Sequence, residues 1–165
     1  MPSSSRPYRF FLQYTLTSPS SLANDAQATV YDQTLDDPAT AMALPAGYAS
    51  GVRVDITVSP AALQSGLVEW VLCLLPLGMT VPTFTTESIF DRNRRFIWGH
   101  GALLPRTTTG NAALTTQYWG TIELATRRHY NMNDRFVVTI ANRTGVAFGS
   151  VGARVLVGGD LWLHF

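Results

Sequence analysis

The chain has 165 residues, of which 46% are hydrophobic and only 14% are charged, and its formal net charge is +1 at pH 7. This length suffices for one domain with its own core, and the balanced charge argues neither for nor against a nucleic-acid partner. The longest apolar run, residues 70–79, contains Pro76 and Gly78 and is too short for a membrane helix, and the N-terminus shows no apolar signal segment, so we expect no membrane insertion.

The charged residues that are present have an unusual make-up, because all 12 basic residues are Arg. Arg suits bidentate pairing and interfaces, whereas Lys suits a solvated surface, although a GC-rich coding sequence explains the same bias equally well. A surface so poor in charge predicts extensive burial against partners. The single Cys73 lies in an apolar run and is expected to be a buried small hydrophobe.

Apolar residues alternate with a period of two along most of the chain, which predicts β-strands. In chain order, the expected strands are 8–16, 27–31, 51–59, 67–75, 95–99, 117–125, 135–140 and the C-terminal stretch from 151, which is interrupted at Gly158 and Gly159. Residues 67–75 are apolar on both faces, so this strand should be central and covered on both sides, by a second core layer or by a subunit contact. Ser59, Pro60 and Gly66 predict one or two helical turns between them.

About eight strands joined by loops of uneven length predict an all-β fold. Loops such as 36–50 and 80–95 are long for simple hairpins, which favours a single eight-stranded antiparallel jelly roll, a Greek-key β-sandwich, over an up-and-down barrel. We expect residues 1–165 to form one domain, in which residues 1–7 are a flexible or extended arm.

No motif assembles an active site, so we expect no enzymatic activity, no catalytic residue and no cofactor. A pair of acids for glycoside hydrolysis stays open, because distances in space are not visible in a sequence. The candidates are Asp32, Asp36, Asp37, Asp55, Glu69 and Glu123. Asp36 and Asp37 might otherwise be read as a Ca²⁺ loop, but a turn before Pro38 is the simpler interpretation.

A metal site is not expected either. His100 lies between glycines in an expected turn, His129 lies beside Arg127 and Arg128, and His164 is near the C-terminus, so no two have the spacing of a metal pair. The sequon at Asn142 is interpreted as a chance match, since no secretory signal precedes it.

The positive charge is clustered next to aromatic residues. For most of the clustered residues we favour a role at subunit interfaces over binding of phosphates and bases. The candidates for the interface are Arg92, Arg94, Arg95, Arg127, Arg128, His129 and Arg135. Arg6 and Arg9, at the start of the first strand, are the candidates for nucleic-acid binding.

Three stretches together resemble the capsid proteins of small viruses with circular single-stranded DNA that encode a Rep protein. They are VEWVLCLLP, FIWGHGALLP after the intervening loop, and TRRHYNMNDRFVVTIANRT, and the resemblance spans roughly residues 50–145. It implies a single jelly roll with two four-stranded sheets that self-assembles into a small icosahedral shell around the genome, inside the host cell, with no enzymatic activity. The sequence departs from that family in its short basic start, because only Arg6 and Arg9 stand where a long basic arm is usual.

The partners implied are therefore other copies of the chain, a packaged single-stranded nucleic acid and a host receptor. Two other functional classes stay open. A lectin-like sandwich would use Trp70, Trp98, Trp119 and Trp162 as a platform for sugars, although Trp70 is expected in the core. An enzyme on the same fold would depend on Glu69 or Glu123.

Overall fold

The computed structural model describes residues 8–16, 22–34, 46–60, 66–109, 114–124, 126–147 and 151–163. Almost all of the regular structure is β. The strands are β1 (Tyr8–Leu16), β2 (Gln27–Thr34), β3 (Gly47–Pro60), β4 (Leu67–Leu75), β5 (Ile97–Leu103), β6 (Pro105–Thr109), β7 (Leu114–Leu124), β8 (Arg128–Tyr130), β9 (Arg135–Arg143) and β10 (Val151–Leu163). Two short helices, α1 (Glu87–Arg92) and η1 (Arg94–Phe96), lie between β4 and β5.

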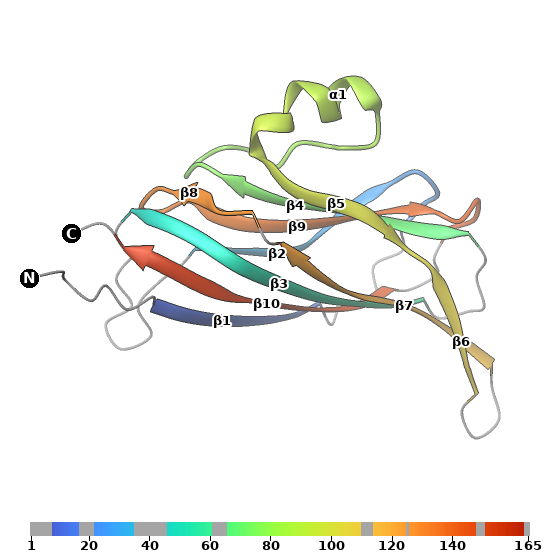
Figure 1. The fold of residues 1–165 in the computed structure, drawn as a ribbon. Helices are drawn as coiled ribbons and strands as arrows, with labels where there is room; N and C mark the ends of the chain where they lie inside the picture. Colours follow the sequence, from blue (N-terminus) through green and yellow to red (C-terminus); the bar gives the residue numbers. More distant parts are fainter. Residues whose placement is uncertain are drawn as a thin grey trace, which may run out of the picture.

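The strands form two antiparallel sheets that face each other (Figure 1). The large sheet has the order β1-β10-β3-β7-β6, with β8 paired to β3, and the small sheet has the order β2-β9-β4-β5. The chain passes from one sheet to the other at six of the nine connections between consecutive strands. Apart from the pairs β4–β5 and β6–β7, strands adjacent in a sheet are therefore distant in sequence. This double Greek key is a jelly roll, as predicted. The additional short strands β6 and β8 enlarge one sheet beyond the two four-stranded sheets that the resemblance implies.

The core lies between the two sheets and is built from the alternating apolar residues. On β3, Val52, Val54, Ile56 and Val58 are buried, as their spacing predicts. The largest buried side chains come from both sheets: they include Tyr31, Tyr118, Tyr130 and Phe136. Trp98 packs against Phe136 with ring centroids 5.8 Å apart. On β3, period-two patterning is therefore sufficient to explain which face is inside.

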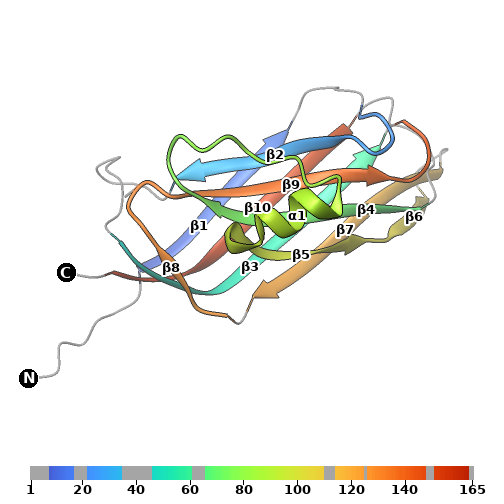
Figure 2. The same ribbon diagram turned by 90° about the horizontal axis from the view of Figure 1, so that it is seen from above.

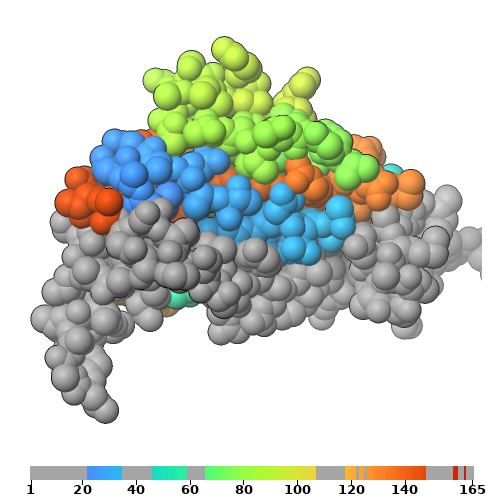
Figure 3. All heavy atoms as spheres, turned by 180° about the vertical axis from the view of Figure 1, so that it is seen from behind, coloured from blue at the N-terminus to red at the C-terminus, as the bar shows by residue number. Residues whose placement is uncertain are grey.

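Strand β4 is buried on both faces, as its continuous apolar run predicts. Val68, Trp70, Leu72 and Leu74 face the large sheet, whereas Val71, Cys73 and Leu75 belong to a second apolar cluster on the opposite face. That cluster is closed by residues 79–97, which carry α1 and η1 and which we call the cover. The cover supplies Phe84, Met79, Val81, Phe90, Phe96 and Ile97. Figure 2 shows α1 lying over β9, β4 and β5, and Figure 3 shows the cover, in green, protruding above β2, in blue.

Side chains from the strands attach the cover to the small sheet. Gln27 on β2 donates from Nε2 to the carbonyl of Pro82 at 2.9 Å, and its Oε1 accepts from the amide of Phe84 at 2.6 Å. At opposite ends of β9, Arg135 donates to the carbonyl of Met79, and Arg143 donates to that of Thr85. These bonds satisfy backbone groups of the cover that its irregular path would otherwise leave unpaired.

Two sequence-based expectations about local structure are wrong. Ser59 and Pro60 do not begin a helix, because they continue the ladder of β3 opposite Gly152 and Val151; residues 61–65 of that expected helix lie outside the described residues. His100 is not in a turn, because Gly99 and Gly101 are strand residues of β5. A Cβ atom at Gly101 would lie 2.9 Å from Nε1 of Trp70, so the glycines make room for the indole rather than for a bend.

Candidate functional site

The predicted interface residues gather at one end of the sandwich, where β4 and β7 end and β5 and β9 begin. We call this region the arginine end. It contains the last residue of α1, the η1 helix, the short strand β8 and the first residue of β9, which bear Arg92, Arg94, Arg95, Arg127, Arg128, His129 and Arg135. Leu75 pairs in register with Arg135, and Tyr130 pairs with Gly47, so both sheets contribute to this end (Figure 1).

Arg128 joins two segments of the arginine end that are distant in sequence. Its Nη1 donates to the carbonyl of Ile97 and its Nη2 to the carbonyl of Arg95, so one guanidinium connects β8 to the end of η1. Burial lowers the pKa of Arg128, and the nearby Cys73 opposes that change. The planar fork of Arg fits two neighbouring carbonyl groups in a way that a Lys ammonium does not. Arg128 therefore acts within the subunit, as a brace.

Arg127 and His129, on either side of the brace, are exposed and both contact Tyr48 of β3. The guanidinium of Arg127 lies 4.1 Å from the centre of the Tyr48 ring, and the His129 ring meets Tyr48 edge-on at 5.3 Å. On the other segment, Arg95 lies over the ring of Phe96 at 4.6 Å. Contact with an aromatic face holds a cation in position without neutralising it. Within the described residues, no ion pair connects Arg92, Arg94, Arg95 or Arg127 to an acid.

Arg135 is placed differently from the other members of the cluster. Its Nη1 lies 2.6 Å from Oδ2 of Asp32 on β2, and its Nη2 donates to the carbonyl of Met79 at the start of the cover. Its side chain is only 19% exposed. Arg135 thus fixes the cover and the edge strand β2 to the beginning of β9, a role that spacing in the sequence does not reveal.

Exposed apolar side chains occur at three separate places on the molecule. Leu77 and Met132, in the turns that follow β4 and β8, are 67% and 57% exposed at the arginine end. Leu104 and Trp119 are 66% and 43% exposed near the edge strand β6, where Arg106 lies 4.0 Å over the Trp119 ring. Val146, at the opposite end of the sandwich after β9, is 52% exposed. Within the described residues, the large exposed apolar side chains are therefore spread over three places on the molecule.

Of the two residues predicted to bind nucleic acid, only one belongs to the described part of the chain. Arg6 lies outside the described residues, whereas Arg9 is in β1 and pairs in register with Asp160 of β10. Leu163, near the end of β10, pairs with Gly47, which in turn pairs with Tyr130 of β8. The first strand therefore starts at the same end of the sandwich as the arginine cluster.

The acids considered for catalysis do not form a pair of free carboxylates among the described residues. Asp32 binds Arg135, Glu69 binds Arg143 at 2.8 Å, and Asp55 accepts a hydrogen bond from Thr121 on the outer face of the large sheet. Glu123 lies 3.9 Å from Arg53 on the same face. Asp36 and Asp37 lie outside the described residues, as does His164.

Three other kinds of candidate group, the tryptophans for sugar binding, the Cys73 thiol and the sequon residue Asn142, would need access to solvent, but the structure buries them in whole or in part. Trp70 and Trp98 are in the core at 5% and 8% exposure, so the predicted platform of four tryptophans is not formed. Burial raises the pKa of the Cys73 thiol to about 12, even though Arg128 lowers it, so the group stays a protonated thiol at neutral pH. Asn142, the sequon residue, is fully buried and its amide donates to the carbonyls of Leu22 and Val146.

In the described part of the chain, no group of three or more His, Cys, Asp or Glu residues is arranged to hold a metal ion. No helix there has the length and apolar character needed to cross a membrane.

Comparison with known proteins gives similarity of structure only. No protein-family model and no curated protein sequence matches the chain. Among solved structures, a chain from tomato aspermy virus aligns over 92% of this chain and 77% of its own length, with 8% identity and a TM-score of 0.48. A chain from infectious bursal disease virus, Gx strain, aligns over 91% of this chain and 32% of its own, with 10% identity and a TM-score of 0.41. The VP2 subviral particle of the same virus aligns over 98% of this chain and 43% of its own, with 9% identity and a TM-score of 0.30. Identities and scores this low assign no family.

Proposed function

We propose that this chain is a structural protein that self-assembles into a closed shell, a viral capsid in which the jelly roll is the repeating unit. Its role is to build the shell around a genome, without catalysis of its own, and its location is the virion after assembly in the host cell. The proposal includes the finer assignment to small circular single-stranded DNA viruses, which rests on the three resembling sequence stretches.

The observation that carries the proposal is the distribution of exposed apolar side chains at three places on one small jelly roll. A closed symmetric shell requires each subunit to contact several neighbours through different surfaces, whereas a simple dimer needs one. At the β6 edge, exposed Trp119 contacts Arg106, and the arginine end bears both exposed apolar residues and Arg127. Neither Arg106 nor Arg127 has an ion-pair partner in the described part of the chain. Aromatic residues and Arg are the types enriched in protein interfaces.

Jelly rolls also occur in lectins and other proteins, so the fold alone does not decide between these functions. The burial of Trp70 and Trp98 removes half of the predicted sugar platform. Asp32 and Glu69 each form an ion pair with an Arg, which favours a structural role for these carboxylates over a catalytic one.

The first test is the mass of the purified protein by light scattering after size exclusion, with negative-stain images of the same fraction. We expect round particles of about 60 copies or more, as a closed icosahedral assembly requires. A stable monomer or dimer across salt and pH would contradict the shell and would direct the work to glycan arrays.

The second test addresses the arginine end. Arg127→Glu and Leu77→Asp are expected to prevent particle formation while the subunit keeps its circular dichroism spectrum, because both side chains are exposed and neither contributes to the core. Ser88→Asp on α1 is a matched control that adds charge to an exposed site away from the three apolar places. Normal particles from both arginine-end variants would show that this end is not an interface.

Packaged nucleic acid is a separate part of the proposal and involves Arg6 and Arg9. Purified particles should carry nuclease-protected nucleic acid whose amount falls when both residues are changed to Ala, because each Arg neutralises backbone phosphate. Unchanged content in the double variant would assign the contact to other residues.

A further inference from the structure

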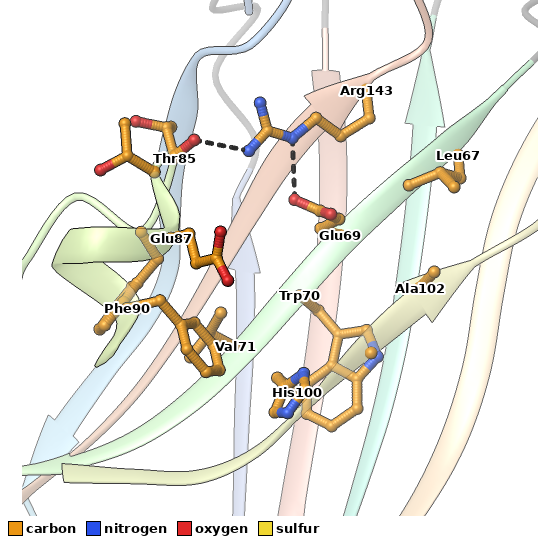
Figure 4. Close-up of a pocket in the computed structure, with 13 residues that line it drawn as sticks. Leu67, Glu69, Trp70, Val71, Thr85, Glu87, Phe90, His100, Ala102 and Arg143 are labelled. Carbon is orange, nitrogen blue, oxygen red and sulfur yellow. Dashed lines mark hydrogen bonds and ion pairs between the residues drawn. The ribbon is translucent and has the colours of Figure 1, made fainter. Parts of the chain in front are cut away.

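A pocket of about 440 Å³ lies between the cover and the outer face of the small sheet, and nothing in the proposed shell function accounts for it. It is open to solvent on one side. Val71, Phe84, Phe90 and His100 line it, and the rings of Phe90 and His100 lie 4.8 Å apart edge to face. Figure 4 shows the labelled residues around the space. The volume is within the range that binds small molecules.

The only cationic side chain among the described residues that line the pocket, Arg143, is neutralised by neighbouring carboxylates. Arg143 is its one guanidinium, and all three of its nitrogens already have acceptors: Nε bonds Glu69 at 2.8 Å, Nη1 bonds Asp25 at 2.6 Å and Nη2 bonds the carbonyl of Thr85 at 2.9 Å. The hydrogen bonds with Glu69 and Asp25 raise the pKa of Arg143. Two carboxylates therefore neutralise this cation, which leaves it poorly suited to receive an anionic ligand.

Glu87 is the charged group that remains without a counter-ion. It stands at the start of α1, and Figure 4 shows its carboxylate directed into the space between Glu69, Phe90 and Val71. In the described part of the chain it has no ion-pair partner. Glu69 also lines the pocket, so two carboxylates face the same space.

We propose that this pocket binds an alkyl cation, that is, a guanidinium or primary ammonium group on a short apolar stem. The cationic head would lie between the carboxylates of Glu87 and Glu69, and the stem would lie along Val71, Phe84 and Phe90. A charge-assisted hydrogen bond to a carboxylate is stronger than a neutral one, and an aromatic wall adds to the attraction for a cation.

Two sources supply this chemistry. One is a free linear amine of the polyamine type, and the other is an Arg side chain of a second copy, since exposed Arg residues of the arginine end have no acidic partner in the described chain. The second source rests on the proposed shell, whereas the pocket's preference for an alkyl cation does not.

The experiment is isothermal titration calorimetry of the purified protein with agmatine, which has a guanidinium, a four-carbon stem and an ammonium. We expect binding that Glu87→Gln weakens about tenfold, the loss of one charge-assisted hydrogen bond. Asp91→Asn is the matched control: it removes the same charge from the same helix at an exposed residue that does not line the pocket. Its affinity should equal that of the unaltered protein.

A second variant makes the test independent of charge. Ala102 on β5 is exposed and lines the pocket opposite Glu69, so Ala102→Trp should fill the space and abolish agmatine binding. The proposal would be overturned if the unaltered protein did not bind agmatine. It would also be overturned if the Glu87→Gln and Ala102→Trp variants bound agmatine as tightly as the unaltered protein.

Particle formation in the presence of agmatine separates the two sources. If an Arg of a neighbouring copy is the occupant, agmatine and Glu87→Gln will both reduce the yield of particles. If a free amine is the occupant, particles will form normally and will retain agmatine after gel filtration. Calorimetry reads the pocket whether or not the chain assembles, so failure of the shell proposal and failure of the pocket proposal give different results.

Discussion

The outer faces of the two sheets are built in opposite ways. On the small sheet, β4 carries Val71, Cys73 and Leu75 outward, and the chain covers them with its own residues 79–97. On the large sheet, β3 and β7 carry Arg53, Asp55, Thr121 and Glu123 outward, and these side chains bind one another at the surface. One jelly roll thus contains a sheet with two apolar faces and a sheet with one.

The difference shows that burial of each face follows from local sequence and not from the topology that the two sheets share. Strand β4 has an uninterrupted apolar run, so exposing its second face to water would cost free energy. Strand β3 alternates, so its outer face is stable in solvent. In the small sheet, the cover excludes water from that second face.

The largest effect is expected from removing the cover's main apolar contact. Phe84→Ala should lower the free energy of unfolding by about 3 kcal/mol, because it removes a buried aromatic ring from the cluster that contains Val71 and Cys73. Urea denaturation followed by fluorescence measures it. Glu123→Ala on the open face is the control and should change stability by less than about 0.5 kcal/mol. Equal losses would mean that the two faces are not energetically different.

A somewhat smaller effect is expected on the inner side of the small sheet. Gly101→Ala places a Cβ atom 2.9 Å from Nε1 of Trp70. The indole must shift within a packed core, which should cost about 1–3 kcal/mol. Urea denaturation and the emission wavelength of the tryptophans measure it, with the neighbouring exposed Ala102→Ser as a control. Unchanged stability and emission would show that the ring does not occupy the space above β5.

The attachment of the cover by Arg143 should contribute less. Arg143→Met removes the bonds to Glu69, Asp25 and the carbonyl of Thr85, and we expect a loss of about 1–2 kcal/mol, since both carboxylates are partly solvated. Limited proteolysis should then cut residues 79–97 sooner than in the unaltered protein. Arg143→Lys keeps the charge but cannot make all three bonds, so its stability and its rate of cleavage should lie between those of the unaltered protein and of Arg143→Met. Cleavage at an unchanged rate would argue that Gln27 and Arg135 suffice to hold the cover.

The smallest effect is expected on the open face. Arg53 lies 3.4 Å from Asp55 and 3.9 Å from Glu123, and its side chain is 56% exposed. Arg53→Ala should therefore change the unfolding free energy by no more than about 0.5 kcal/mol. The same measurement in high salt should reduce even this difference, because solvent ions screen exposed pairs. A loss above that of Arg143→Met would reverse the ranking of the two faces.

The fold was predictable from the sequence because it depends on a local property, the alternation of apolar residues. Val52, Val54, Ile56 and Val58 assign the inner face of β3 without any knowledge of its neighbours. The double burial of β4 was also predictable, but its cause was not. Whether the second layer is the chain itself or another subunit depends on where residues 79–97 return in space, and no local pattern records that.

The candidate site was less accessible to prediction for the same reason. Arg128 and Arg135 look like exposed charges in the sequence, yet they bind carbonyl groups of Arg95, Ile97 and Met79, which are distant along the chain. The glycines around His100 suggested a turn because the residue that needs their small size, Trp70, lies on another strand. The acidic pocket under α1 likewise combines β4, β5, β9 and the cover, so its preference for a cation became visible only with the structure.

If the proposed shell forms, Arg128 would also affect the rate at which its subunits associate. Because its guanidinium holds β8 and η1 together within the folded chain, the proposed contact surface around Arg127 would already be ordered before a second copy arrives. Association then needs no slow rearrangement, so its initial rate should rise with the square of the subunit concentration, as for preorganised partners. Loss of the brace would introduce a concentration-independent lag, visible in stopped-flow light scattering of an Arg128→Ala variant.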